Sequence, residues 1–401
     1  MRKIHFVLPA NNSSSQTRVM AEYANQLVQR GFDVTVSVPH FDFYDFVQWR
    51  LRYDRRRPSW PGESLIRWVR WLGVPFLKSL LIRRPWFGQS AHRVDPRIKI
   101  NRYGHRPSAR NMPDADVVMV FQPYLLPHLL ALPASKGRVL GSVRLDYKAG
   151  TSDPDEAIAE WRKFCNSFYQ TLNIPLFTVS RRSLESARAM GVEVEAVIPN
   201  GVNTEEFRDG GRRGLLDPVR VTLFTQDHPQ KGRDFGCAVV ESLRRSQELR
   251  GVLFCAAGGN VKPAQRPLFD KVYGYLTGED YVRMFQETDI FIYPSLYEGF
   301  PAVPLEAMAS GCALVTTLIS GVEEYGVHGE NCLTAQPKDV EGMARNVLSL
   351  IQDARLRDSL RGKGLQTARQ FSWKAATGRL VEFIDSLEGA PARTTSLAHS
   401  A

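Results

Sequence analysis

Residues 290–317 read Ile-Phe-Ile-Tyr-Pro-Ser-Leu-Tyr-Glu-Gly-Phe-Pro-Ala-Val-Pro-Leu-Glu-Ala-Met-Ala-Ser-Gly-Cys-Ala-Leu-Val-Thr-Thr, and this stretch decides the fold. Its first four residues are apolar, and all are β-branched or aromatic, which is typical of a buried parallel strand. After a loop, a helix can begin at Pro301 or Pro304, because the N–H that proline lacks would have no helical partner there. Gly311 ends that helix, and residues 313–317 predict the next strand.

Two carboxylates stand in this stretch. Glu298 lies on the loop before the helix, and Glu306 lies one turn inside the helix. In an open α/β sheet such a loop lies at the carboxyl ends of the strands, where ligands bind. Paired carboxylates also suggest the acid and base of a glycosidase. These two share one loop–helix unit, which argues against that chemistry.

Strand and helix patterns alternate twice along the chain. Residues 3–9 and 34–38 predict strands around a helix at 17–30, and the alternation restarts with a strand at 219–224. Two Rossmann-like halves joined by a glycine-rich, charged linker predict a ligand cleft between domains. The expected parts are an N-terminal domain at 1–207 with a basic, tryptophan-rich insertion at 47–110, a linker at 208–218, a C-terminal domain at 219–370, a helix at 371–388 that returns to the first domain, and a disordered tail at 389–401.

The positive charge is concentrated in residues 47–110. This segment holds fourteen arginines, two lysines and three acidic residues, a net charge of +13, whereas the whole chain carries +10. The remainder is therefore slightly acidic, so a general nucleic-acid surface is a poor interpretation and no nucleic-acid partner is expected. Residues 40–110 read as irregular apart from two short helix patterns at 63–72 and 76–84.

Five of the seven tryptophans lie in the same segment: Trp49, Trp60, Trp68, Trp71 and Trp86. One interpretation is a helical layer packed on the first domain, with arginine side chains reaching past it to water. The other is a helix pair within 47–86 that lies in the surface of an anionic membrane, with aromatic rings at headgroup depth and cations on the lipid. The sequence leaves both open.

The cysteines and the apolar runs indicate where in the cell the protein is found. Five cysteines, an odd number, are widely spaced without metal-ligand spacing, which favours reduced thiols in a cytosolic protein. No apolar run is long enough for a transmembrane helix. The run at the N-terminus is too short for a signal peptide and predicts a first strand. We expect a cytoplasmic protein, with peripheral attachment at the inner membrane face as the further option.

Several motifs together carry a resemblance to a known family. Glu298 and Glu306 have Glu-x7-Glu spacing, followed by Ala-Met-Ala-x-Gly, and Lys231 with its following glycine comes after the first strand of the second half. Residues 197–207 read Val-Ile-Pro-Asn-Gly-Val-Asn-Thr-Glu-Glu-Phe. Here the chain resembles the retaining glycosyltransferases of family 4, which have the GT-B fold: two Rossmann-like domains whose parallel sheets face across a cleft. The likeness covers nearly all of the second half and the end of the first.

The resemblance implies a reaction. A hexose or deoxyhexose would move from a nucleotide-diphosphate sugar to a glycan or lipid-linked acceptor, in the assembly of a polysaccharide or glycolipid. The anomeric configuration would be retained, and neither a metal nor a cofactor is expected.

The resemblance also implies roles for single residues. Lys231 would bind the donor diphosphate and stabilise the leaving nucleotide as its negative charge grows. Glu298 would orient hydroxyls of the donor sugar, and Glu306 would accept the two ribose hydroxyls. Asp146 is the candidate in the first domain for contact with the acceptor or the transferred sugar. The other expected substrate-binding residues are Gly299, Phe300, Ala302 and Val303 near the helix N-terminus, and Arg233, Gln226, Ser14, Ser15, Asn200, Tyr275 and Leu276.

The chain departs from the family pattern at three places, one of which is the run at 143–148, where the family often has a histidine. Ser14 and Ser15 stand where the family has a glycine pair, and Gln226 stands where it has a phosphate-binding arginine. Arg233 is the expected substitute for that arginine. Two other functions fit the same fold: an epimerase of nucleotide sugars, for which no cluster of acid and base groups stands out, and a non-catalytic partner protein, against which the intact lysine and two glutamates argue.

Overall fold

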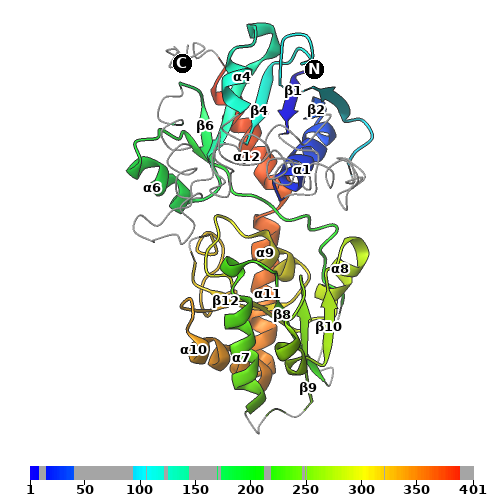
Figure 1. The fold of residues 1–401 in the computed structure, drawn as a ribbon, viewed down its shortest axis with the longest axis vertical. Helices are drawn as coiled ribbons and strands as arrows, with labels where there is room; N and C mark the ends of the chain where they lie inside the picture. Colours follow the sequence, from blue (N-terminus) through cyan, green and yellow to red (C-terminus); the bar gives the residue numbers. More distant parts are fainter. Residues whose placement is uncertain are drawn as a thin grey trace, which may run out of the picture. The chain divides into compact units, whose positions relative to one another are not determined.

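The structure, a computed structural model, describes residues 1–8, 15–39, 94–104, 106–121, 125–143, 169, 173–211, 218–245, 249, 251–319 and 321–388. The chain divides into two compact units (Figure 1). The first comprises Met1–Thr178, Ser183–Val197 and Val381–Ala401, and the second comprises Val179–Arg182 and Ile198–Leu380. In the described ranges, no helix combines the length and apolar character that a bilayer crossing needs.

The first unit is built on a parallel sheet whose seven described strands run in the order β3-β2-β1-β4-β5-β6-β7. Its central strands are almost entirely buried, as strands covered on both faces must be. The strands are β1 (Lys3–Val7), β2 (Asp33–Pro39), β3 (Lys99–Tyr103), β4 (Val117–Val120), β5 (Arg138–Val143), β6 (Leu176–Thr178) and β7 (Ala196–Val197). The described helices in this part of the chain are α1 (Ser15–Gln29), α4 (Leu126–Leu130), the 3-10 turn η2 (Ala134–Lys136) and α6 (Arg181–Ala189).

Helix α12 (Trp373–Ser386) begins in the second unit, and its last residues belong to the first. There Phe383 packs edge-on against Phe177 of β6, with ring centroids 6.1 Å apart. Beyond the helix end, the Leu387 carbonyl accepts a 2.5 Å hydrogen bond from Arg138. Arg2 forms ion pairs with Asp385 and Glu388. The returning C-terminal helix expected from the sequence is therefore present, held by an aromatic contact and by its terminal charges.

The second unit repeats the architecture with a parallel sheet of six described strands in the order β10-β9-β8-β11-β12-β13. The strands are β8 (Val219–Phe224), β9 (Val252–Ala257), β10 (Lys271–Gly274), β11 (Ile290–Tyr293), β12 (Ala313–Thr317) and β13 (Leu333–Ala335). The helices are α7 (Arg233–Arg245), α8 (Gly278–Gln286), α9 (Ala302–Ala309), α10 (Val340–Gln352) and α11 (Ala354–Gln370), with 3-10 turns η3 (Pro229–Lys231) and η4 (Pro263–Leu268).

The two faces of this sheet are covered by different helices. Alternate residues of a strand point to opposite faces, so Ile292 of β11 packs with α7 and α10, while Phe291 packs with α8 and α9. All four residues of β11 are buried, so side chains cover this central strand on both faces. Residues at the strand ends are thereby held on a rigid base.

The deciding stretch folds as its pattern predicts. Strand β11, helix α9 and strand β12 follow in the expected order. Pro301 is the residue just before the helix, and Gly311 follows its end with a φ of 83°, in the left-handed region that glycine adopts without strain.

The division between the units differs from the boundary expected at 207. Residues from Ile198 onward belong to the second unit. Phe207 lies edge-on to two rings of α8, Tyr281 and Phe285, at 6.0 Å from each. The Val202 N–H donates to the Phe371 carbonyl at 2.8 Å. Because these partners lie in the second unit, the segment joins it before the glycine-rich stretch is reached.

Two of the described strands, β3 and β13, have no sequence pattern that predicts them. β3 lies in the segment expected to be irregular, and only Tyr103 of its five residues is buried. Its pairing with β2 stabilises it, so its sequence needs no apolar alternation. β13 has three residues, too few to show a period. The expected insertion lies largely outside the described residues, as do its five tryptophans, the linker residues 212–217 and the tail.

Candidate functional site

The site in the second unit forms where the order of the sheet reverses. The chain moves outward from β8 through β9 to β10, then returns to the other side of β8 with β11. At such a reversal the loops after the two central strands leave in different directions and open a crevice for a ligand. Here those loops are residues 225–232 after β8 and 294–301 after β11, and they carry Lys231 and Glu298.

Backbone contacts hold the two loops together. The Gln230 carbonyl accepts a hydrogen bond from the Leu296 N–H at 2.7 Å, and its oxygen lies 3.1 Å from the Ser295 hydroxyl oxygen. Gly232 has a φ of 66°, and a β-carbon built there would lie 2.0 Å from the Pro294 carbonyl oxygen. Only glycine fits this approach. The backbones that carry Lys231 and Glu298 are therefore fixed relative to each other.

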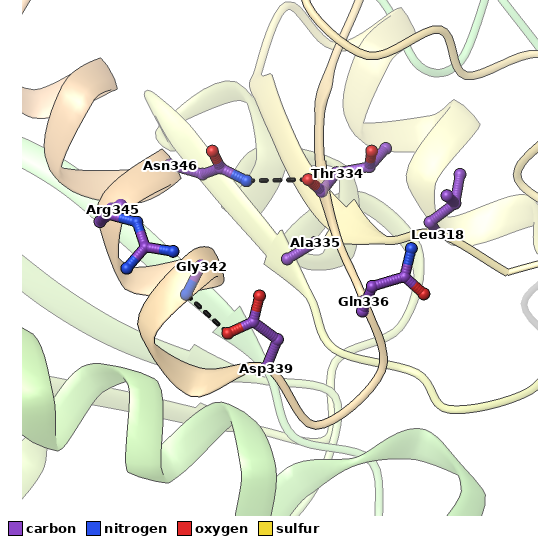
Figure 2. A pocket seen from close by; sticks show the side chains of 8 residues that line it. All are labelled: Leu318, Thr334, Ala335, Gln336, Asp339, Gly342, Arg345 and Asn346. Carbon is purple, nitrogen blue, oxygen red and sulfur yellow. Dashed lines mark hydrogen bonds between the residues drawn. The ribbon is translucent and has the colours of Figure 1, made fainter.

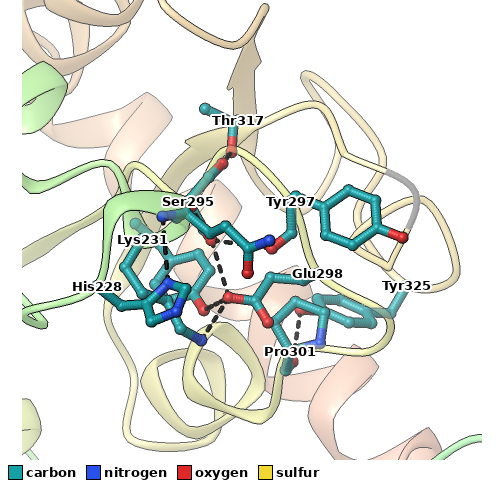
Figure 3. A network of polar contacts seen from close by, with 10 residues as sticks. His228, Lys231, Ser295, Tyr297, Glu298, Pro301, Thr317 and Tyr325 are labelled. Atoms are coloured by element: carbon teal, nitrogen blue, oxygen red, sulfur yellow. Dashed lines mark hydrogen bonds and ion pairs between the residues drawn. The ribbon is translucent and has the colours of Figure 1, made fainter. Parts of the chain in front are cut away.

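Three donors converge on one oxygen of Glu298 (Figure 3). The Lys231 ammonium lies 2.5 Å from Glu298 Oε1. The Tyr293 hydroxyl donates to the same oxygen at 2.7 Å, and the Ser295 hydroxyl donates at 2.8 Å. The Lys231 and Glu298 side chains are 24% and 15% exposed, so a ligand can reach them from solvent. Hydrogen bonds to an ionised partner are short and strong, which accounts for the tight cluster.

The Tyr293 hydroxyl is a permanent donor. Complete burial, and then the neighbouring Glu298 carboxylate, raise the pKa of Tyr293 well above its usual value of 10.0. The phenol therefore keeps its proton at any physiological pH. Ser295 is fully buried as well, and the Thr317 hydroxyl donates to its carbonyl. Both side chains belong to the rigid floor of the site.

Glu306 lies deeper, on α9, and is 1% exposed. Its Oε2 accepts a 2.8 Å hydrogen bond from the hydroxyl of Tyr281 on α8. The Tyr281 ring packs edge-on against Phe285, with centroids 5.0 Å apart. A buried carboxylate is tolerated only with polar partners, and this phenol is one of them. Glu306 is thus held in one orientation below the surface.

The loop of residues 294–301, called the glutamate loop because it carries Glu298, ends at the N-terminus of α9. The Pro301 carbonyl accepts a 2.9 Å hydrogen bond from the buried Tyr325 hydroxyl. A β-carbon at Gly321 would lie 2.6 Å from the Pro301 ring and 2.7 Å from the Gly299 carbonyl, so the loop after β12 packs tightly on this end. Phe300 is buried, whereas Ala302 and Val303 are half-buried.

Three of the remaining expected residues lie on, or next to, the loops that follow β8 and β10. Arg233 donates to the Asp227 carboxylate at 2.7 Å and to the Asn260 carbonyl at 3.3 Å, so its charge is engaged by the loops that follow β8 and β9. Gln226 is half-buried just after β8. Tyr275 is 74% exposed after β10.

Leu276 and Asn200 are more enclosed. Leu276 packs against the core on the α8–α9 face of the sheet. Asn200 is buried beside Gly201, where a β-carbon would lie 2.3 Å from the Trp373 nitrogen. The side chains of Ser14, Ser15 and Asp146 lie outside the described residues, so their expected roles stay predictions.

Three residues that donate hydrogen bonds to the site carboxylates were not predicted from the sequence: Tyr281, Tyr293 and Ser295. The last two occupy the end of β11 and the first turn of its loop, and a signal for them existed. Hydroxyl-bearing residues at the carboxyl end of a buried strand are candidates for any site at that edge. Tyr281 gave no signal, because its contact with α9 depends on how two helices pack.

A hollow of about 290 Å³ lies away from this cluster, at the end of β13 and the start of α10 (Figure 2). Asp339 caps the helix by accepting from the Gly342 N–H at 2.9 Å, and Asn346 donates to the Thr334 carbonyl at 3.0 Å. Its lining residues are Leu318, Thr334, Ala335, Gln336, Asp339, Gly342, Arg345 and Asn346. It shares no lining residue with the cluster around Glu298.

Part of the second unit matches a family of known enzymes. Residues 219–353 match the family model of glycosyl transferases group 1. O-antigen chain mannosyltransferase B of Escherichia coli is 35% identical over 121 residues, which cover 30% of this chain and 31% of that protein. Glycogen synthase of Mycobacterium tuberculosis is 27% identical over 196 residues, which cover 46% of each chain. The matches thus span less than half the length of either relative.

The likeness to solved structures extends over both units. Anabaena Alr3699/HepE in complex with UDP-glucose aligns with a TM-score of 0.64 and 12% identity, over 96% of this chain and 100% of that one. At an identity this low, the similarity shows a shared fold and nothing about function. The expected fold class, GT-B with two Rossmann-like units on parallel sheets, is confirmed. On that fold, residues 219–353 carry the sequence signature of the group 1 glycosyl transferases.

Proposed function

We propose that this protein is a retaining glycosyltransferase that moves a sugar from a nucleotide-diphosphate donor to a glycan or lipid-linked acceptor. The observation that carries the proposal is the contact between Lys231 and Glu298 at the reversal point of the second sheet. It lies within the segment that matches the group 1 glycosyl transferases. The names of the relatives, a mannosyltransferase and a glycogen synthase, favour sugar transfer over an epimerase or a non-catalytic partner.

The chemistry follows from what a nucleotide sugar presents. As the glycosidic bond breaks, negative charge grows on the departing diphosphate, and a preorganised cation stabilises it. Lys231 supplies that cation, and the N–H groups at the start of α9 add partial positive charge. Glu298 accepts hydroxyls of the donor sugar. Glu306 accepts the ribose diol, because an ionised carboxylate has two oxygens for two O–H donors.

The details of mechanism belong to the proposal as well. With a lysine and a helix N-terminus on the diphosphate, the leaving group is stabilised without a metal or a cofactor. A phosphate oxygen of the donor takes the acceptor proton on the same face of the sugar, and the configuration is retained. Asp146 is proposed to contact the acceptor or the transferred sugar, with the first unit as the acceptor side.

The base of the donor is proposed to lie near Tyr275 and Leu276, after β10. Tyr275 offers an exposed ring, and base–aromatic stacking is favourable for any base. The complex of the Anabaena protein contains UDP-glucose, which makes a uridine donor the first to try. For the location, we propose the cytoplasm, with residues 47–86 in contact with an anionic membrane.

The experiment is a thermal shift followed by a transfer assay. Purified protein is heated with UDP-, GDP- and dTDP-sugars, since a ligand at about 100 times its Kd raises the unfolding free energy by about 2.7 kcal/mol. One class should raise the Tm, and Lys231→Ala should abolish both the shift and the transfer. The matched control is Lys271→Ala, which removes a lysine at the first residue of β10. Lys271 lies at the amino ends of the parallel strands, whereas Lys231 lies beyond their carboxyl ends. Transfer that survives in Lys231→Ala contradicts the phosphate assignment.

A further inference from the structure

Within the protein, the Glu298 carboxylate competes with the donor diphosphate for the Lys231 ammonium. Its ammonium lies 2.5 Å from Glu298, and a cation paired with a carboxylate must leave that partner, wholly or in part, to bind a phosphate. We infer that Tyr293 and Ser295 are positioning residues that hold Glu298 in place while Lys231 moves from it to the diphosphate. The inference rests on the proposed function and assigns roles to two residues that the resemblance leaves without one.

The geometry separates a mobile partner from two fixed ones. Tyr293 and Ser295 are buried at the end of the strand that leads into the glutamate loop. The Tyr293 ring cannot move away from Glu298 without moving that strand, and Ser295 is fully buried two residues further on. Lys231 comes from the other loop, carries its charge on a flexible four-carbon stem and is partly exposed. It is therefore the one member of the trio that a ligand can draw away.

The electrostatics explain why two fixed donors are needed. A carboxylate that is 15% exposed loses much of its hydration, and removing its cation leaves that charge poorly compensated. Hydrogen bonds from neutral hydroxyls to an ionised oxygen are strong. With Tyr293 and Ser295 in place, Glu298 keeps two hydrogen-bond donors and its orientation after Lys231 moves. Its oxygens then face the donor sugar.

The arrangement predicts opposite effects of two substitutions on nucleotide affinity. Glu298→Gln removes the competing charge, so Lys231 is free for the diphosphate and a nucleoside diphosphate binds more tightly. Tyr293→Phe removes a fixed donor, so Glu298 depends more on Lys231 and releases it less readily. The nucleotide then binds more weakly. A simple loss of structure at the site weakens binding in both variants.

The test is titration calorimetry of the full chain with UDP, GDP and dTDP. With the nucleotide that the wild type binds, we expect affinity to rise about three- to tenfold in Glu298→Gln, and to fall by a similar factor in Tyr293→Phe and Ser295→Ala. The matched control is Tyr273→Phe, which removes a 3.2 Å hydroxyl contact to another glutamate, Glu287, and should leave affinity unchanged.

The double variant Tyr293→Phe/Glu298→Gln distinguishes positioning from general damage. If Tyr293 acts through the Glu298 charge, the phenylalanine has no effect on affinity in the glutamine background. Equal effects in both backgrounds overturn the inference, and so does weaker or unchanged binding in Glu298→Gln. If Tyr293→Phe fails to fold, Ser295→Ala with Glu298→Gln forms the same cycle. Wild-type protein that binds none of the three nucleotides contradicts the proposed function itself. If the wild type binds a nucleotide but Glu298→Gln and Tyr293→Phe do not change its affinity in opposite directions, only the inference is contradicted.

Discussion

Gly232 and Pro294 approach so closely that a β-carbon at 232 would lie 2.0 Å from the Pro294 carbonyl oxygen. The contact joins the lysine loop, which follows β8, to the glutamate loop, which follows β11. Together with the hydrogen bond that the Gln230 carbonyl accepts from the Leu296 N–H, it sets the distance between the backbones that carry Lys231 and Glu298. The site thus depends on a residue that carries no functional group.

Gly232→Ala should therefore destabilise the protein and weaken nucleotide binding. The alanine combines a strained positive φ with a backbone clash, and we expect a loss of about 2–4 kcal/mol in unfolding free energy. Gly329→Ala is the matched control, because Gly329 also has a positive φ, 76°, but no atom within 4 Å of the added carbon. Urea unfolding should show a cost of about 1 kcal/mol there. Equal losses in the two variants would contradict the role of the Pro294 contact.

Tyr281→Phe should destabilise the protein by about 1–3 kcal/mol, because the buried Glu306 carboxylate loses a hydrogen-bond donor. If Glu306 holds the ribose, affinity for ribonucleotides should fall as well, through misorientation of the carboxylate. Urea unfolding measures the first effect, and calorimetry with the nucleotide that the wild type binds measures the second. In a Glu306→Gln background the stability cost of Tyr281→Phe should shrink. A cost that stays the same would show that the hydroxyl matters for another reason.

Stability should fall in weak acid because of His5, which is buried in β1 with its Nε2 2.7 Å from the Ser37 hydroxyl. Burial, and then the Lys136 charge, lower the pKa of His5 from 6.5 to about 4. Between these two values the unfolded chain binds a proton that the folded chain refuses, so the unfolding free energy decreases as the pH falls from about 6.5 to about 4. The contribution of this shift is about 3 kcal/mol.

The measurement is the urea midpoint of the wild type and of His5→Gln at several pH values from 7.5 to 4. Other groups titrate over the same range, so the difference between the two proteins isolates His5. His5→Gln keeps a polar group near Ser37 but cannot take up the proton, and its midpoint should fall less with acid. Parallel curves for the two proteins would rule out a pKa shift of this size.

Membrane contact through residues 47–86 should require aromatic side chains at headgroup depth. The protein should float with vesicles that contain an anionic lipid and stay behind with neutral phosphatidylcholine vesicles, because arginines attract the anionic surface. Replacing Trp68 and Trp71 with alanine should reduce flotation by removing apolar burial while leaving the charge unchanged. Undiminished flotation of that variant would favour the packed helical layer instead.

Much of the fold could be predicted because its signals are local. The apolar run of β11, the prolines before α9 and Gly311 after it lie within a few residues of the elements that they delimit. β3 escaped prediction because its stability comes from pairing with β2, more than sixty positions earlier in the chain. The unit boundary was misplaced because the rings that Phe207 contacts belong to α8, far along the sequence.

The sequence by itself determined the alternation of strands and helices, the Glu-x7-Glu spacing and the lysine after the first strand of the second half. Each is a property of neighbouring residues. Only the tertiary structure decided that Lys231 and Glu298, 67 positions apart, meet in an ion pair, and that Tyr293 and Ser295 donate to the same oxygen. The physical reason is the order of the sheet: β8 and β11 pair directly although β9 and β10 lie between them in the chain. No local pattern contains that pairing.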